Sequence, residues 1–214
     1  NIFDGKLRPW LAETEAEYNP DFTSVTVKLR SGIEWSDGEP FTANDVVFTV
    51  KMVMNNPTML FSPNLNEWTE DVVAVDDRTV RFDLKRPNPR YILDYFGVHF
   101  YNAIRFVPEH IWKDVDDPTT FTNFDMDKGW PIATGPYYLA KTSASEVAWD
   151  RHDGWWAAKT GFKDLPTPER VIFIPMGSPD RQVALLNNNE VDHLETLSAG
   201  PHESVIASNP NIRG

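Results

Sequence analysis

The chain has 214 residues, of which 41% are hydrophobic and 13% aromatic. This composition can bury the core of one large domain or two small ones, and it excludes global disorder. The 32 acidic and 20 basic residues give a net charge of −12, which repels phosphate backbones, so we expect no nucleic-acid partner. The absence of cysteine excludes a disulfide framework, thiolate chemistry and zinc–thiolate sites.

The first predicted elements are a strand and a helix. Residues 23–30 alternate between hydrophobic and polar side chains, as expected for a strand with one buried face. Thr42 and Asp45 form a capping-box pattern just before an apolar stripe over residues 43–54, which predicts a helix. Pro57 follows closely and is expected to end it.

A hairpin and a broken helical segment are predicted next. Val73 and Val75 alternate on one arm of the hairpin, and residues 80–84 form the other arm after a turn at two aspartates. Residues 91–112 are predicted to be helical, with Pro108 dividing the segment into two pieces.

The second half begins with a polar loop over residues 114–129, which we expect at the surface. Residues 137–141 and 147–151 then predict a second hairpin. The short β-branched run at residues 171–174 is typical of a buried strand.

The last predicted element is a helix over residues 180–186, preceded by Ser178 as its cap and by Pro179 in its first turn. Strands and helices are interspersed along the chain, and local hairpins recur. This order predicts an α/β (mixed α+β) fold with a mixed sheet, hairpins and flanking helices.

The predicted core surrounds the first helix, because a turn brings a tryptophan beside its apolar stripe. The residues expected to pack there are Trp35, Phe41, Val46, Val47 and Val50. Either Trp155 or Trp156 is also expected to be mostly buried, since tryptophan is costly to expose.

No catalytic or metal-binding pattern stands out. None of the five histidines has the i, i+4 spacing of a helical metal pair, and we expect each of them to be a surface or capping residue. Residues 125–129 resemble a calcium loop only loosely, because the glycine comes one position early and no closing glutamate follows. Glycine patterns for phosphate or dinucleotides are absent as well, so we expect no cofactor and no metal.

The most informative feature of the composition is its high content of tryptophan, tyrosine and phenylalanine. Trp68 and Trp130 lie in polar, turn-rich surroundings, where a platform for a ligand and a place in the core are equally compatible with the pattern. Trp10, Trp112 and Trp149 lie in periodic segments and are predicted to be structural.

One long segment makes the chain recognisable. Residues 29–48 read LRSGIEWSDGEPFTANDVVF, which resembles a motif of the extracytoplasmic solute-binding proteins of ABC importers, family 5 (peptide/nickel/oligosaccharide-binding). Shorter blocks follow in the order found in that family. They are DDRTVRFDL at 76–84, VPEHI at 107–111, TGPY at 134–137, GWW at 154–156, ALLNNNEVD at 184–192 and NPNI at 209–212.

The resemblance implies a periplasmic-binding-protein-like lobe. Members of the family have two lobes that close on a ligand, and residues 1–214 resemble most of lobe one. The second lobe, the first strand and the returning C-terminal segment are then expected to be absent from this sequence. Two positions depart from the family pattern: Glu15 stands where an aromatic residue is common, and Asn189 replaces a glycine, whose left-handed turn asparagine tolerates best.

The function implied by the resemblance is binding without catalysis. The protein is expected outside the cytoplasm, in the periplasm or lipid-anchored on the outer face of the membrane, where it binds an oligopeptide or short oligosaccharide and delivers it to an ABC transporter permease. Closure of the two lobes on the ligand is the implied mechanism. The ligand contacts expected on cleft-facing loops are Phe61, Trp68, Tyr95, Tyr101 and Trp130.

Two alternatives from other classes remain open. The first is a carbohydrate-active enzyme that uses two of the many carboxylates together with tryptophan platforms, although the sequence singles out no pair. The second is a sensory ligand-binding domain on the same fold. Between the possible ligands, the main usage of the family favours a peptide, and the abundance of tryptophan favours a sugar.

Overall fold

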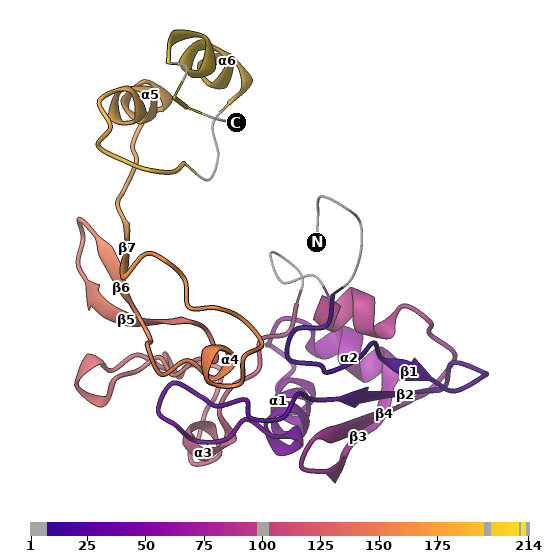
Figure 1. The fold of residues 1–214 in the computed structure, drawn as a ribbon. Helices are drawn as coiled ribbons and strands as arrows, with labels where there is room; N and C mark the ends of the chain where they lie inside the picture. The colour runs from indigo at the N-terminus through magenta and orange to yellow at the C-terminus, as the bar shows by residue number, and fades with distance from the viewer. Residues whose placement is uncertain (1–7, 98–102, 195–197, 210, 213–214) are drawn as a thin grey trace. The chain divides into compact units, whose positions relative to one another are not determined.

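The computed structural model describes residues 8–97, 103–194, 198–209 and 211–212, and it divides into two compact units (Figure 1). The first unit comprises Asn1–Ala140 and Trp149–Arg170, and the second comprises Lys141–Ala148 and Val171–Gly214. The fold class predicted from the sequence is confirmed, since helices are interspersed with antiparallel sheet.

The first unit is built on a four-stranded antiparallel sheet with the strand order β1-β2-β4-β3. The strands are β1 (Glu17–Tyr18), β2 (Ser24–Lys28), β3 (Thr69–Asp76) and β4 (Thr79–Leu84). Both the first predicted strand and the first predicted hairpin are therefore confirmed. In the register of the central pair, Val25 lies opposite Phe82, and both side chains are buried.

The alternation of Val73 and Val75 does not identify the buried face of β3. Val72 is fully buried, whereas Val73 is half-buried and Val75 is 57% exposed. The pairing of β3 with β4 shifts register twice, between Thr69 and Asp71 and again near the turn. Each shift places an additional residue in one strand, so simple alternation along β3 does not identify the face that packs on the core.

Helix α1 (Ala43–Asn55) begins as the sequence predicts. The Thr42 side chain accepts a hydrogen bond from the backbone N–H of Asn44, and the Asp45 carboxylate accepts one from the backbone N–H of Thr42. Two of the otherwise unpaired donors at the helix start are thereby satisfied. The stripe predicted to be apolar faces the sheet, and α2 (Ser62–Trp68) follows in the chain and packs on α1.

The predicted core is confirmed around Trp35. This side chain is 3% exposed, and its ring meets that of Phe41 edge-on at 5.3 Å. Val46 and Val50 are buried in the same cluster, and Val47 packs against it while half-buried. Trp155 and Trp156 are also buried, as expected of at least one of them, at 4% and 1% exposure.

Of the segment predicted as a broken helix over residues 91–112, the described residues are helical only at its two ends, and residues 98–102 lie outside the described part of the chain. A short π-helical turn, η1 (Leu93–Gly97), and a single turn, α3 (Glu109–Trp112), are present, while residues 103–108 form neither helix nor strand. Several aromatic residues in this segment pack into the core, which overrides weak helical propensity. In the polar loop that follows, the structure has one 3₁₀ turn, η2 (Met126–Lys128).

The second hairpin is confirmed, and a third strand extends it into a sheet of order β5-β6-β7. Its strands are β5 (Tyr137–Thr142), β6 (Val147–Arg151) and β7 (Arg170–Phe173). A short helix, α4 (Trp156–Lys159), lies between β6 and β7 in the chain. The prediction that β7 is buried is wrong, because Ile172 and Phe173 are 52% and 59% exposed.

The second unit contains two helices that pack on each other, α5 (Pro179–Asn187) and α6 (Ala199–Ser208). Ser178 caps α5 as predicted, accepting a hydrogen bond from the backbone N–H of Arg181. Asn189 follows with φ of 59°, so it occupies the left-handed turn expected of it. The sequence analysis did not predict α6, which has only a weakly amphipathic pattern; Val205 is its buried residue.

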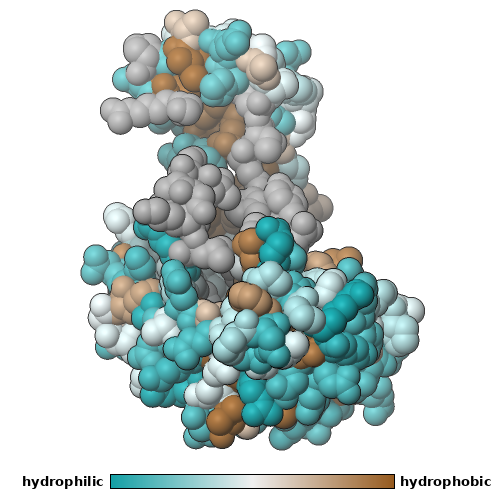
Figure 2. All heavy atoms as spheres, turned by 90° about the vertical axis from the view of Figure 1, so that its right-hand side faces the viewer, coloured by the Kyte–Doolittle hydropathy of each residue, from teal (hydrophilic) through white to brown (hydrophobic). Residues whose placement is uncertain are grey.

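On the face drawn in Figure 2, hydrophilic residues dominate and hydrophobic ones form small separate patches. This surface agrees with the net charge of −12. Among the residues that the structure describes, no helix has the length and apolar character needed to span a membrane.

Candidate functional site

Two of the five predicted ligand contacts, Phe61 and Tyr95, lie together. Their rings meet edge-on at 6.4 Å, and Tyr95 packs in turn on Tyr91 at 5.3 Å. Tyr95 is only 7% exposed, and this burial, followed by the negative charge of Asp94, raises the pKa of its phenol. Phe61 is half-buried, so it keeps part of its ring accessible.

Trp68, at the end of α2, is half-buried and has one ring face covered. The guanidinium carbon of Arg86 lies 4.0 Å from the centre of the ring, and Arg86 also pairs with the carboxylate of Glu67. A cation held over an indole face is a favourable arrangement in itself. Arg86 therefore occupies one face of the Trp68 ring, and that face is not free to stack on a ligand.

Trp130 is half-buried and also has neighbours on its ring. Phe121 meets it edge-on at 5.8 Å, and the Lys128 ammonium lies 4.7 Å from its ring centre. Among the described residues, no ring contact joins Trp130 or Trp68 to Phe61. Tyr101, the fifth predicted contact, lies outside the described residues.

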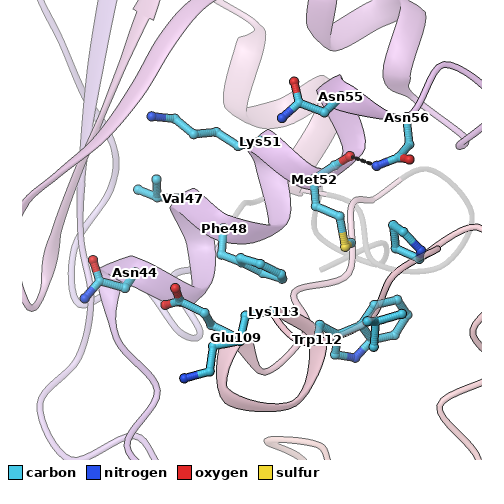
Figure 3. A pocket seen from close by; sticks show the side chains of 12 residues that line it. Asn44, Val47, Phe48, Lys51, Met52, Asn55, Asn56, Glu109, Trp112 and Lys113 are labelled. Atoms are coloured by element: carbon cyan, nitrogen blue, oxygen red, sulfur yellow. Dashed lines mark hydrogen bonds between the residues drawn. The ribbon is translucent and has the colours of Figure 1, made fainter.

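A hollow of about 420 Å³ lies between α1 and the segment that begins with α3 (Figure 3). Phe48 and Met52 extend into it from α1, and Trp112 lines it from α3. The remaining lining residues are Asn44, Val47, Lys51, Asn55, Asn56, Glu109, Lys113, Val115 and Pro118.

The hollow has an apolar floor and a polar rim, but it is open to solvent, unlike the enclosed pockets that bury most of a ligand. The sequence analysis did not identify it. A signal was nevertheless present, because Phe48 and Met52 are spaced four residues apart on α1 and are not among its buried residues. On the rim, Lys51 is paired with Asp71 at 3.3 Å.

Trp10 was predicted to be structural, yet it is 46% exposed. Its ring lies 6.4 Å from Trp155 and meets Phe162 edge-on at 5.4 Å, so it is packed on one side and open to solvent on another. The other two tryptophans predicted to be structural, Trp112 and Trp149, are half-buried.

Over the described part of the chain, no group of three or more histidine, aspartate or glutamate residues is arranged to hold a metal ion. His110 pairs with Asp37 at 2.8 Å, which joins α3 to the turn after Trp35. Several carboxylates have their pKa values lowered by local partners. The side-chain hydrogen bond from Arg170 lowers the pKa of Asp150, and the backbone N–H of Val72 lowers that of Asp71.

Comparison with known proteins places these features in a family. The sequence model described as "Bacterial extracellular solute-binding proteins, family 5 Middle" matches residues 6–212. Protein XP55 of Streptomyces lividans is 31% identical over 173 residues, covering 77% of this chain and 30% of that protein. The glutathione-binding protein GsiB of Pectobacterium atrosepticum is 26% identical, covering 87% of this chain and 33% of that protein.

Among solved structures, the chain is similar to a periplasmic oligopeptide-binding protein of an oligopeptide ABC transporter from Thermotoga maritima, determined with mannohexaose bound. The TM-score is 0.73 and the identity 29%, over 89% of this chain and 33% of that one. The chain thus spans about a third of the length of each of these relatives.

Proposed function

The chain belongs to the bacterial extracellular solute-binding proteins of family 5, and on that premise we propose that it forms part of a protein that binds an oligopeptide or short oligosaccharide for an ABC transporter. The observation that carries this proposal is the family match over residues 6–212 together with the shared fold. Within the proposal, the bound solute is delivered to the membrane permease of the transporter, and the protein catalyses no reaction.

Both classes of solute have support among the relatives. GsiB is named as a glutathione-binding protein, and the Thermotoga maritima oligopeptide-binding protein was solved with mannohexaose. The proposal therefore covers a short peptide or a short sugar. The proposed location is outside the cytoplasm, in the periplasm or lipid-anchored on the outer face of the membrane.

The proposed mechanism is closure of two lobes around the solute, with residues 1–214 forming most of lobe one. The ligand contacts predicted from the sequence remain Phe61, Trp68, Tyr95, Tyr101 and Trp130. Of these, the half-buried rings of Phe61, Trp68 and Trp130 offer a partly accessible surface, whereas Tyr95 would need its neighbours to move. The hollow beside α1 is a further candidate position for a small ligand.

The test is a thermal-shift screen of the full-length protein with peptides, oligosaccharides and metal chelates, followed by calorimetric titration of every hit. A solute at a hundred times its dissociation constant should stabilise the protein by about 2.7 kcal/mol. The solute should be recovered intact. Reproducible cleavage that a single aspartate or glutamate substitution abolishes would instead establish the carbohydrate-active enzyme alternative.

The closure mechanism has its own test. The same solute is titrated into the full-length protein and into the chain of residues 1–214. If closure contributes about 4 kcal/mol, the shorter chain should bind about 1,000-fold more weakly. Equal affinities would show that the second lobe contributes nothing to binding.

A further inference from the structure

The exposed side of Trp10 lies beside two basic side chains. The Arg30 guanidinium carbon is 3.8 Å from the centre of the Phe162 ring, and its Nε donates a hydrogen bond to the Trp10 carbonyl oxygen at 2.8 Å. The Lys163 ammonium lies 5.5 Å from the centre of the Phe162 ring and 5.8 Å from that of Trp10. We call Trp10, Arg30, Phe162 and Lys163 the Trp10 surface.

The Trp10 surface is positively charged within an acidic chain. Across the described residues, neither Arg30 nor Lys163 makes an ion pair with a carboxylate, although the net charge of the chain is −12. Lys159, one turn earlier in the chain, is by contrast paired with Glu34 at 2.5 Å. Lys28 pairs with the Glu13 carboxylate and lowers its pKa, and the charge of Arg30 adds to this effect. Lys163 is therefore the main cation of this surface that is open to a ligand carboxylate.

The aromatic layer beneath this surface is rigidly held. The indole N–H groups of Trp155 and Trp156 both donate to the carbonyl oxygen of Thr134, at 2.9 and 2.8 Å. Trp155 packs under Trp10, and Trp156 stacks on Phe162 at 5.7 Å. A supported aromatic face loses little conformational entropy when a ligand binds to it.

We propose that the Trp10 surface binds a carboxylate-bearing end of the transported solute. The flat indole of Trp10 covers a sugar ring or an apolar side chain, while Lys163 and Arg30 attract the carboxylate next to it. This inference rests on the proposed function and narrows its solute class to acids. Two kinds of solute carry a carboxylate next to a sugar ring or an apolar side chain: a uronic-acid sugar and the C-terminal residue of a peptide.

Calorimetric titration of the full-length protein distinguishes these two kinds of solute. Trigalacturonate is compared with its methyl ester, and the tripeptide Ala-Ala-Phe with its C-terminal amide. The variants are Lys163→Gln and, as a matched control, Lys85→Gln, which removes an exposed lysine that donates to the Asn66 carbonyl oxygen and makes no ion pair with any described residue. Trp10→Phe tests the ring while keeping an aromatic side chain in the layer.

Either trigalacturonate or Ala-Ala-Phe should bind about three- to tenfold more tightly than its own neutral analogue, as expected for partly exposed charges. Lys163→Gln should remove that preference, Lys85→Gln should preserve it, and Trp10→Phe should weaken both members of the pair. The preferred acid identifies the kind of solute. The inference is overturned if neither acid is preferred, if the preference survives Lys163→Gln, or if all four probes fail while another solute of the screen binds. Failure of every solute in the screen would overturn the proposed function as well.

Discussion

The Asp45 carboxylate joins the start of α1 to α3, and its replacement should destabilise the first unit. The side chain is 4% exposed. One oxygen accepts the backbone N–H of Thr42 at 2.8 Å, and the other accepts the backbone N–H of Glu109 at 2.9 Å. The two donors are 67 residues apart in the chain, so a single carboxylate closes the helix cap and fixes α3 beside it.

The magnitude follows from the two hydrogen bonds. A hydrogen bond to a charged group contributes about 1.5–3 kcal/mol, and losing an N-terminal cap costs about 1 kcal/mol. Both donors are only partly buried, so water can replace some of the loss. We therefore expect Asp45→Ala to lower the free energy of unfolding by about 3 kcal/mol. Asp45→Asn should cost about half of this value, because its amide offers only one acceptor oxygen for two donors.

The assay is urea unfolding followed by tryptophan fluorescence. All eight tryptophans belong to the first unit, so the signal reports on that unit alone. Asp127→Asn, at an exposed aspartate, serves as the control and should change stability by less than about 0.5 kcal/mol. If Asp45→Ala behaved like this control, the carboxylate would not hold the two elements together.

Substitutions at three further positions test the core, the pH dependence and a turn. Trp35→Ala should cost about 3–5 kcal/mol in urea unfolding, as for a large buried aromatic residue, and a loss under about 1 kcal/mol would mean that the ring is exposed in solution. Tyr91→Phe should cost about 1–3 kcal/mol because the buried Thr69 hydroxyl loses its partner at 2.7 Å. Burial raises the pKa of Tyr91, so the unfolded chain ionises first, and stability is full below about pH 10 and falls above it. Tyr91→Phe should flatten that alkaline loss in unfolding curves measured across pH, and an unchanged slope would assign the loss to other groups. Asn189→Ala should cost about 1 kcal/mol and Asn189→Gly should not, because φ of 59° strains side chains other than asparagine and aspartate, whereas glycine adopts it freely; thermal melts that rank the two variants equally would contradict this conformation.

Elements whose signals are local could be predicted from the sequence. The capping box of α1 needs only residues three apart, and the turn between β3 and β4 needs only a few residues between two runs of β-branched side chains. Ser178 and Asn189 likewise act on backbone groups within a few positions of themselves. In each case the interacting groups are neighbours in the chain, so the interaction can be predicted from the local pattern of residues.

Elements that depend on distant partners could not be predicted in the same way. The face of β3 that packs on the core is determined by its register shifts against β4, and these leave no mark on the alternation of Val73 and Val75. Residues 103–108 form neither helix nor strand, although they lie in a segment with helical character. The buried Ile104 and half-buried Phe106 belong to the core cluster, and this packing outweighs local propensity.

The same reasoning explains why the aromatic contacts of the candidate site were the least predictable feature. Whether an indole is a platform or a structural residue depends on what covers its faces. Trp68 is covered by Arg86, which follows β4 in the chain, while Trp10 meets Phe162 and Trp155 from a segment about 150 residues later. Polar surroundings in the sequence left Trp68 undecided between a platform and the core, and periodic surroundings indicated that Trp10 was structural. Exposure follows instead from long-range packing, so the cations beside Trp10 become a basis for solute recognition only once the fold is known.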